Sequence, residues 1–249
     1  MARALLFFGC VALAACAPDP VKWEVETRDG PALTVPWTPP VMPSGTPLCA
    51  GSLVATRAKG DTAYAAWWAP RADSTALLVV SRSADGGRSW RAPETADSTD
   101  HGRTGCARQT PFIAADSTNG YVHVVYFMVA AEGPGIFFTN SMGGGTMFHS
   151  PVPIVYGDRP TASAVACNGD TVAVAYIDPN SVTPQLWLAL SRTTGHIFES
   201  RIEVSPSTVQ ASRPAVTVSG QRVVVGWLET NRSGGVAVTV IKSGLIRSQ

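Results

Sequence analysis

The chain has 249 residues, of which 45% are hydrophobic and 15% are charged, and its net charge at pH 7 is +1. This composition can supply a sizeable core, and the near-neutral charge excludes an electrostatic basis for nucleic-acid binding. Together, 23 glycines and 19 prolines favour many short strands joined by turns, so we expect an all-β protein.

The first segment has the pattern of an export signal. Arg3 precedes the apolar run Ala4–Ala15, which is too short to span a membrane as a helix. The tetrad Leu-Ala-Ala-Cys that ends at Cys16 resembles the lipobox of bacterial lipoproteins. This resemblance implies a signal peptide over residues 1–15, a lipid on Cys16, and an extracytoplasmic envelope protein, facing the periplasm or the cell surface, whose lipid is its only membrane attachment. The alternative is an ordinary signal peptide cleaved near Ala17.

Residues 16–48 are rich in proline, which is typical of an extended tether. Within them, Val21–Thr27 alternates well enough to form a strand. The main domain is expected to cover residues 49–249.

The main domain contains a repeat. Four β-rich runs each end in an aromatic residue: Asp61–Trp68, Gly120–Tyr126, Asp170–Tyr176 and Gln221–Trp227. In each of the first three repeats, the aromatic residue is followed 15 positions later by a serine, namely Ser83, Ser141 or Ser191. A regular period of this kind predicts repeated structural units.

The stretch Ser83–Trp90 (SADGGRSW) predicts a tight turn between two strands. Gly87 permits a positive φ, and the Asp85 carboxylate can accept backbone N–H groups within the turn. With Ser83 and Trp90, this pattern resembles the Asp-box of sialidases and other BNR-repeat β-propellers. The resemblance implies a sialidase-like β-propeller of four-stranded antiparallel blades, with the box as a structural turn on the face away from the ligand. Two degenerate copies keep the serine, the second glycine and the aromatic residue; they begin at Ser141 and Ser191.

About four blades are visible, whereas sialidase-like propellers normally have six. Three accounts fit this count: a compact four-bladed propeller, an open arc completed by association into an oligomer, or a truncated reading frame. We expect a closed or nearly closed four-bladed form. The fourth repeat begins at Ser212 and lacks its last strand, which Val21–Thr27 could supply.

An up-and-down strand order decides which loops share a face. The box turns lie at one end of the blades, and the loops expected at the other end are 69–75, 91–110, 128–134, 149–160, 178–184, 199–213 and 229–234. The longest, 91–110, is the natural place for function. Cys49 and Cys106 both precede innermost strands of neighbouring repeats and are the preferred disulfide pair, whereas Cys167 lies in an apolar strand and is expected to be a buried thiol.

Three arginines precede innermost strands in register: Arg108, Arg159 and Arg213. The resemblance to sialidases implies that they converge as a clamp on an anionic substrate group. The alternative is a recurrent strand entry in which each guanidinium binds loop carbonyls. With His101 and Arg103 from the long loop, these arginines are the candidate ligand-binding residues.

No catalytic residue is identified. Sialidases carry a Phe/Tyr-Arg-Ile-Pro motif, which this chain lacks, and they need a tyrosine nucleophile, a paired glutamate and an aspartate acid/base. The candidate carboxylates are Asp73, Asp97, Asp100, Glu132, Asp178 and Glu229. Tyr126 and Tyr176 are expected to pack between blades.

The four histidines are His101, His123, His149 and His196, and their spacing predicts no metal site. No cofactor motif is present in the sequence. We therefore expect a module that binds a glycan or a protein without metal or cofactor. The alternative function is an exo-sialidase-type glycoside hydrolase with an arginine anion clamp.

Overall fold

In the computed structural model, the described residues are 19–29, 37–231 and 235–247, and they form sixteen strands and no helix. Accordingly, this part of the chain contains no helix long and apolar enough to cross a membrane. The expected signal peptide and Cys16 lie outside the described residues.

The strands form four four-stranded antiparallel sheets, as expected for the blades of a β-propeller. The first sheet contains β2 (Val54–Arg57), β3 (Ala63–Pro70), β4 (Ala76–Ser83) and β5 (Glu94–Asp97). The second contains β6 (Phe112–Ala115), β7 (Val122–Ala130), β8 (Gly133–Ser141) and β9 (Val152–Tyr156). The third contains β10 (Ser163–Asn168), β11 (Thr171–Ile177), β12 (Leu186–Ser191) and β13 (Ser200–Glu203). The fourth contains β14 (Val209–Ser219), β15 (Arg222–Asn231), β16 (Val238–Ile246) and β1 (Val21–Arg28).

The outermost strand of the fourth sheet comes from the N-terminal segment. β1 pairs antiparallel with β16, so that Val21 lies opposite Ile246. Arg28, at the end of β1, donates to Glu229 of β15 at 2.6 Å. The strand expected over Val21–Thr27 is therefore present, and it completes the sheet that lacked a fourth strand.

Each sheet buries its apolar faces against its neighbours. Trp68 and Tyr126 belong to the cluster between the first and second sheets, Phe138 to the cluster between the second and third, and Trp227 to the cluster between the third and fourth. Tyr126 is fully buried, as expected for a packing aromatic. These three interfaces hold the sheets together in chain order.

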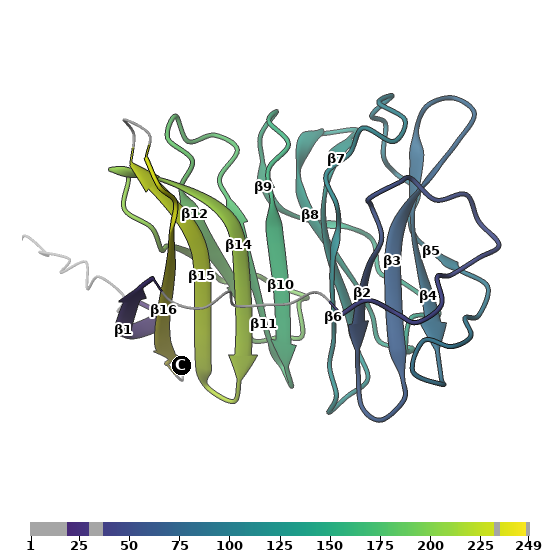
Figure 1. The fold of residues 1–249 in the computed structure, drawn as a ribbon, viewed down its shortest axis with the longest axis horizontal. Coiled ribbons are helices and arrows are strands. Elements are labelled where there is room, and N and C mark those ends of the chain that lie inside the picture. The colour runs from purple at the N-terminus through teal and green to yellow at the C-terminus, as the bar shows by residue number, and fades with distance from the viewer. Residues whose placement is uncertain (1–18, 30–36, 232–234, 248–249) are drawn as a thin grey trace, which may run out of the picture.

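The four sheets form an open fan and not a closed ring. Inner strands β2, β6, β10 and β14 contact one another in that order, and no hydrophobic cluster of the described residues joins the fourth sheet to the first. Figure 1 shows these strands in a row, with the rest of the fourth sheet on the left and the rest of the first on the right. The expectation of a closed form is therefore wrong. The repeat count gives the number of sheets, but side-chain packing sets the angle between them.

The outer face of the first sheet is covered by residues 37–48, which we call the N-terminal cap. This face carries a buried cluster that includes Trp67 and Val79. The backbone N–H of Val41 donates to the carbonyl of Gly87 at 3.2 Å, and Trp90 Nε1 donates to the carbonyl of Val41 at 2.7 Å. The segment predicted as a tether thus packs partly as a structural element.

Candidate functional site

The inner strands of the four sheets line one open cavity of about 390 Å³, which we call the inner groove. Its walls are Trp37, Val54–Arg57, Phe112–Ala115, Ala164–Cys167 and Ala215–Val218. Each of these four strands is an edge strand, hydrogen-bonded to a neighbour on one side only. The groove therefore combines apolar side chains with main-chain groups at the free strand edges.

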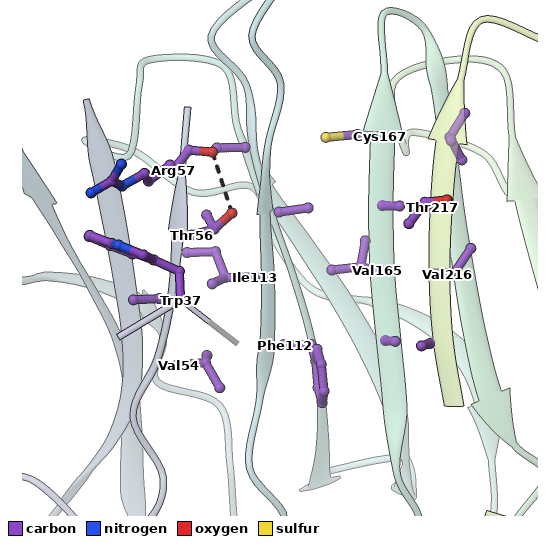
Figure 2. A pocket seen from close by; sticks show the side chains of 17 residues that line it. Trp37, Val54, Thr56, Arg57, Phe112, Ile113, Val165, Cys167, Val216 and Thr217 are labelled. Atoms are coloured by element: carbon purple, nitrogen blue, oxygen red, sulfur yellow. Dashed lines mark hydrogen bonds between the residues drawn. The ribbon is translucent and has the colours of Figure 1, made fainter. Parts of the chain in front are cut away.

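The polar side chains of the inner groove lie at its two sides. The Arg57 guanidinium lies over the Trp37 ring, 4.8 Å from its centroid, which is a cation–π arrangement. Figure 2 shows this pair on the β2 side and Thr217 and Cys167 on the opposite side. Cys167 is partly buried, and this burial, assisted by the charge of Asp116, raises the pKa of its thiol to about 12 and favours the protonated form.

The loop ends are arranged as the strand order predicts. The backbone N–H of Gly105 donates to Ser74, and that of His101 donates to Val129, so the long loop lies against the loops between second and third strands. At the opposite end, the N–H of Gly86 in the Ser83–Trp90 turn donates to Asp61. The Ser83–Trp90 turn and the long loop therefore lie at opposite ends of the first sheet.

The long loop is fastened to the fold and not open. The expected disulfide joins Cys49 and Cys106. Trp68 Nε1 donates to the carbonyl of Gln109 at 2.9 Å. The buried side chain of Arg108 forms an ion pair with the buried Asp100, with Nη1 and Oδ2 2.5 Å apart. Its Nε and Nη2 atoms donate to the carbonyls of two loop glycines, Gly105 and Gly102. Arg108 therefore stabilises its own loop.

The other two arginines have surroundings of their own. Arg159 donates to the carbonyls of Pro179 at 2.8 Å and Ser181 at 2.5 Å. Arg213 is exposed, with φ at 50°, beside the irregularity in β14. Arg108 and Arg159 therefore match the strand-entry alternative, in which guanidinium groups bind loop carbonyls.

Of the loop residues expected to bind ligand, His101 lines a cavity and Arg103 is exposed. His101 lies with Glu132 around a cavity of about 310 Å³, which we call the loop pocket. Its remaining walls are Thr99, Met128, Ala130, Ala131, Phe137 and Pro151. The loop pocket is therefore a second, smaller candidate site, and it lies at the end of the sheets where the sequence predicts function, beside the long loop 91–110.

Most candidate carboxylates have structural partners. The hydroxyl of Tyr126 donates to Asp97 at 2.7 Å, but Tyr126 is 0% exposed and Asp97 5%, so no substrate reaches this pair. Burial, with the adjacent Asp97 charge, raises the pKa of Tyr126 well above its usual value. Three others are bound within their own blades: Asp73 to Thr75, Asp178 to Ser181, and Glu229 to Arg28.

The Ser83–Trp90 turn is held by its own side chains. Ser83 Oγ accepts the N–H of Gly87 at 2.8 Å, and Asp85 accepts the N–H groups of Arg88 and Ser89. Hydrogen bonds from Ser89 hold the pKa of Asp85 well below its usual range. In the other two turns, Ser141 and Ser191 accept the equivalent glycine N–H groups. The serine and the glycine therefore form the common part of these turns.

No family model and no curated protein matches the chain. Among solved structures, it is similar to a Hadza microbial sialidase, with a TM-score of 0.49 and 15% identity over 72% of this chain and 44% of that chain. It is also similar to a polysaccharide lyase described as PL25-Ulvanlyase, with a TM-score of 0.49 and 13% identity over 77% and 49%. A third is Bacteroides ovatus Xyloglucan PUL GH43B, with a TM-score of 0.48 and 13% identity over 74% and 36%. The chain spans less than half the length of each.

Sequence reasoning missed the inner groove and its aromatic residue. The proline-rich pattern of residues 16–48 predicts a tether at Trp37, and the strand pattern places only arginines at the ends of the innermost strands. The available signal was the position of an isolated tryptophan within a proline-rich segment, because a bulky aromatic residue in an extended segment usually has a surface to pack against.

Proposed function

We propose that this chain is a non-catalytic binding module that holds a glycan in the inner groove. The observation that carries the proposal is the convergence of four edge strands and the Trp37–Arg57 pair on one cavity of about 390 Å³. Cavities of this size accommodate small ligands.

The two kinds of surface in the groove complement a saccharide. A sugar ring has apolar C–H faces, which pack against Trp37 and aliphatic residues such as Val165 and Val216. Its hydroxyls are donors and acceptors, which suit the free main-chain groups of the strand edges, the Thr217 hydroxyl and Arg57. The groove therefore offers both contacts that a glycan needs.

The contacts of the arginines argue against the exo-sialidase alternative. A carboxylate clamp needs guanidinium groups free for bidentate pairing. Arg108 is engaged by Asp100, and Arg159 by the Pro179 and Ser181 carbonyls. The buried Tyr126–Asp97 pair offers no accessible nucleophile.

A protein ligand is the second candidate, and the edge strands favour it. An extended polypeptide segment can add to a free strand edge through main-chain hydrogen bonds. β14 supplies eleven residues of such an edge. This candidate occupies the same groove, but its ligand would be an extended polypeptide segment instead of a sugar.

We further propose that the module is lipid-anchored through Cys16 in an extracytoplasmic compartment. The Cys49–Cys106 disulfide supports an oxidising compartment. Five positions separate Cys16 from Val21, so anchoring would keep the fourth sheet near the membrane surface. An open fan is also compatible with association into an oligomer, which the mass of the purified protein in solution would test.

The test uses the full chain, purified in mild detergent, on arrays of glycans and extended peptides, followed by calorimetry with each hit. Substitutions Arg57→Gln and Thr217→Val should weaken glycan binding, and Arg103→Gln at the loop end should not. Binding that survives both groove substitutions but is lost in His101→Ala would move the site to the loop pocket and overturn the proposal. Hydrolysis of a fluorogenic sialoside that collapses in Arg108→Ala, Arg159→Ala and Arg213→Ala would overturn it in favour of catalysis.

A further inference from the structure

Two exposed histidines from neighbouring sheets meet at the end of the molecule that carries the Ser83–Trp90 turn and its copies. His149 follows the turn of the second sheet, and His196 lies in the turn of the third. Their ring centroids are 5.5 Å apart, and the ring planes make an angle of 89°. The two residues are 47 positions apart in the sequence, so spacing along the chain gave no sign of this contact.

A chain of hydrogen bonds fixes the backbone under both rings. The N–H of His149 donates to the carbonyl of Asn140 at 2.9 Å, and Asn140 Nδ2 donates to the carbonyl of Thr194 at 3.3 Å. The N–H of His196 donates to the carbonyl of Thr193 at 3.0 Å. The turns of the second and third sheets are therefore hydrogen-bonded to each other. This contact holds the backbones of His149 and His196 at a fixed distance before any ligand binds.

Both imidazoles are available for a ligand. Within the described part of the chain, neither ring takes part in a side-chain hydrogen bond or ion pair, and both residues are exposed. Rotation about their side-chain torsions can therefore turn a nitrogen of each ring toward a common point. No group of three or more His, Cys, Asp or Glu among these residues is placed to hold a metal ion, so water would complete any coordination shell.

We propose that His149 and His196 together bind one divalent transition-metal ion of the kind that prefers imidazole: Zn²⁺, Cu²⁺ or Ni²⁺. Zinc–imidazole bonds are about 2.0 Å long, which places two rings on one tetrahedral ion with centroids roughly 5 Å apart. The observed centroid separation of 5.5 Å is close to this value. The bound ion links the second sheet to the third.

This site is independent of the proposed glycan function. It lies on turns, whereas the inner groove is lined by the strands β2, β6, β10 and β14 and by Trp37. Ion binding is expected to stabilise the contact between the second and third sheets, because a ligand that binds only the folded state shifts unfolding to higher temperature.

The experiment titrates the untagged full chain, first stripped with a chelator, with Zn²⁺, Cu²⁺ and Ni²⁺ in separate calorimetric runs. We expect one ion per chain, a rise in the midpoint of thermal unfolding, and weaker binding at acidic pH, because protons compete for the imidazole nitrogens. Nuclear magnetic resonance of the histidine ring protons should show that two rings respond together.

Single substitutions His149→Gln and His196→Gln should each abolish the stoichiometric binding and the thermal shift. The matched control is His101→Gln, which removes an exposed histidine at the opposite end and should bind like the original chain. Ion binding that persists in both test variants, or the absence of stoichiometric binding to the original chain, would overturn the proposal. Circular dichroism checks that each variant keeps its β-sheet fold.

Discussion

Gly87 packs against the ring of Trp37 so closely that a Cβ atom on residue 87 would lie 2.9 Å from Trp37 Cη2. The corresponding glycines of the next two turns face aromatic rings of the preceding sheet: Gly145 faces Tyr64, and Gly195 faces Phe138. The first sheet has no preceding sheet, and Trp37 of the N-terminal cap takes that place. The cap therefore substitutes, at this contact, for a missing neighbour.

We expect Gly87→Ala to destabilise the fold by about 1–3 kcal/mol, because a non-glycine residue is strained at positive φ and its Cβ meets Trp37. The φ of Gly87 is 87°. The matched control is Gly86→Ala, at a φ of 72° but with its nearest neighbour 3.7 Å away, which should cost less. Urea unfolding followed by tryptophan fluorescence measures both. Equal costs would contradict a role for the Trp37 contact.

Reduction of the Cys49–Cys106 disulfide should lower stability by about 4 kcal/mol, because the bond closes a long loop in the unfolded chain. The sequence separation of the two cysteines is 57. The double variant Cys49→Ser/Cys106→Ser should unfold at lower urea concentration than the oxidised chain and should not respond to reductant. Cys167→Ser serves as a control, because Cys167 is outside the disulfide.

Stability should fall on acidification because of His123. This residue is 0% exposed, neither ring nitrogen has a hydrogen-bond partner in the described structure, and burial lowers its pKa to about 4 despite the nearby Asp116 and with a small contribution from His196. As the pH falls, the imidazole of His123 takes up a proton near pH 6.5 in the unfolded chain, before it does so in the folded chain. The free energy of unfolding is therefore highest above pH 6.5 and decreases by about 3 kcal/mol as the pH falls toward 4.

The variant His123→Leu removes this titration. Its free energy of unfolding should change less between pH 7 and pH 4 than that of the original chain, whatever its absolute stability. A His123→Leu profile parallel to that of the original chain would assign the acid sensitivity to other groups.

Arg108→Met should destabilise by about 3–5 kcal/mol, because it leaves the buried Asp100 carboxylate without its partner. The ion pair is almost completely buried, with side-chain exposures of 5% and 1%. Arg213→Ala should cost less than about 0.5 kcal/mol, as is usual for an exposed side chain. Thermal unfolding compares the two. Equal losses of stability in the two variants would contradict the assignment of a separate structural role to Arg108.

The sequence was sufficient to predict the local features. A serine 15 residues after an aromatic residue marked three turns, and the structure places Ser83, Ser141 and Ser191 where each accepts the N–H of the turn glycine. The Cys49–Cys106 pairing and the strand at Val21 could also be predicted. These features depend on short-range patterns or on the order of strands within a sheet.

Features set by packing between sheets could not be predicted in this way. The opening of the fan depends on how side chains such as Trp68 and Phe138 fill the space between sheets, which no periodicity encodes. Arg108 illustrates the same limit: its register with Arg159 and Arg213 was correct, but Asp100 lies eight positions away along a folded loop and takes the guanidinium. The inner groove arises only when four separate strands meet.

The pairing of Val21 with Ile246 has a consequence for how the chain folds. The first three sheets are each built from consecutive strands, so they can form while the chain emerges, from contacts that close short loops. The fourth sheet remains one strand short until Val238–Ile246 is available to meet a segment made some two hundred residues earlier. Closing so long a loop is slow. The edge of β16 is therefore the last to be covered, and until β1 pairs with it this edge can pair with other chains.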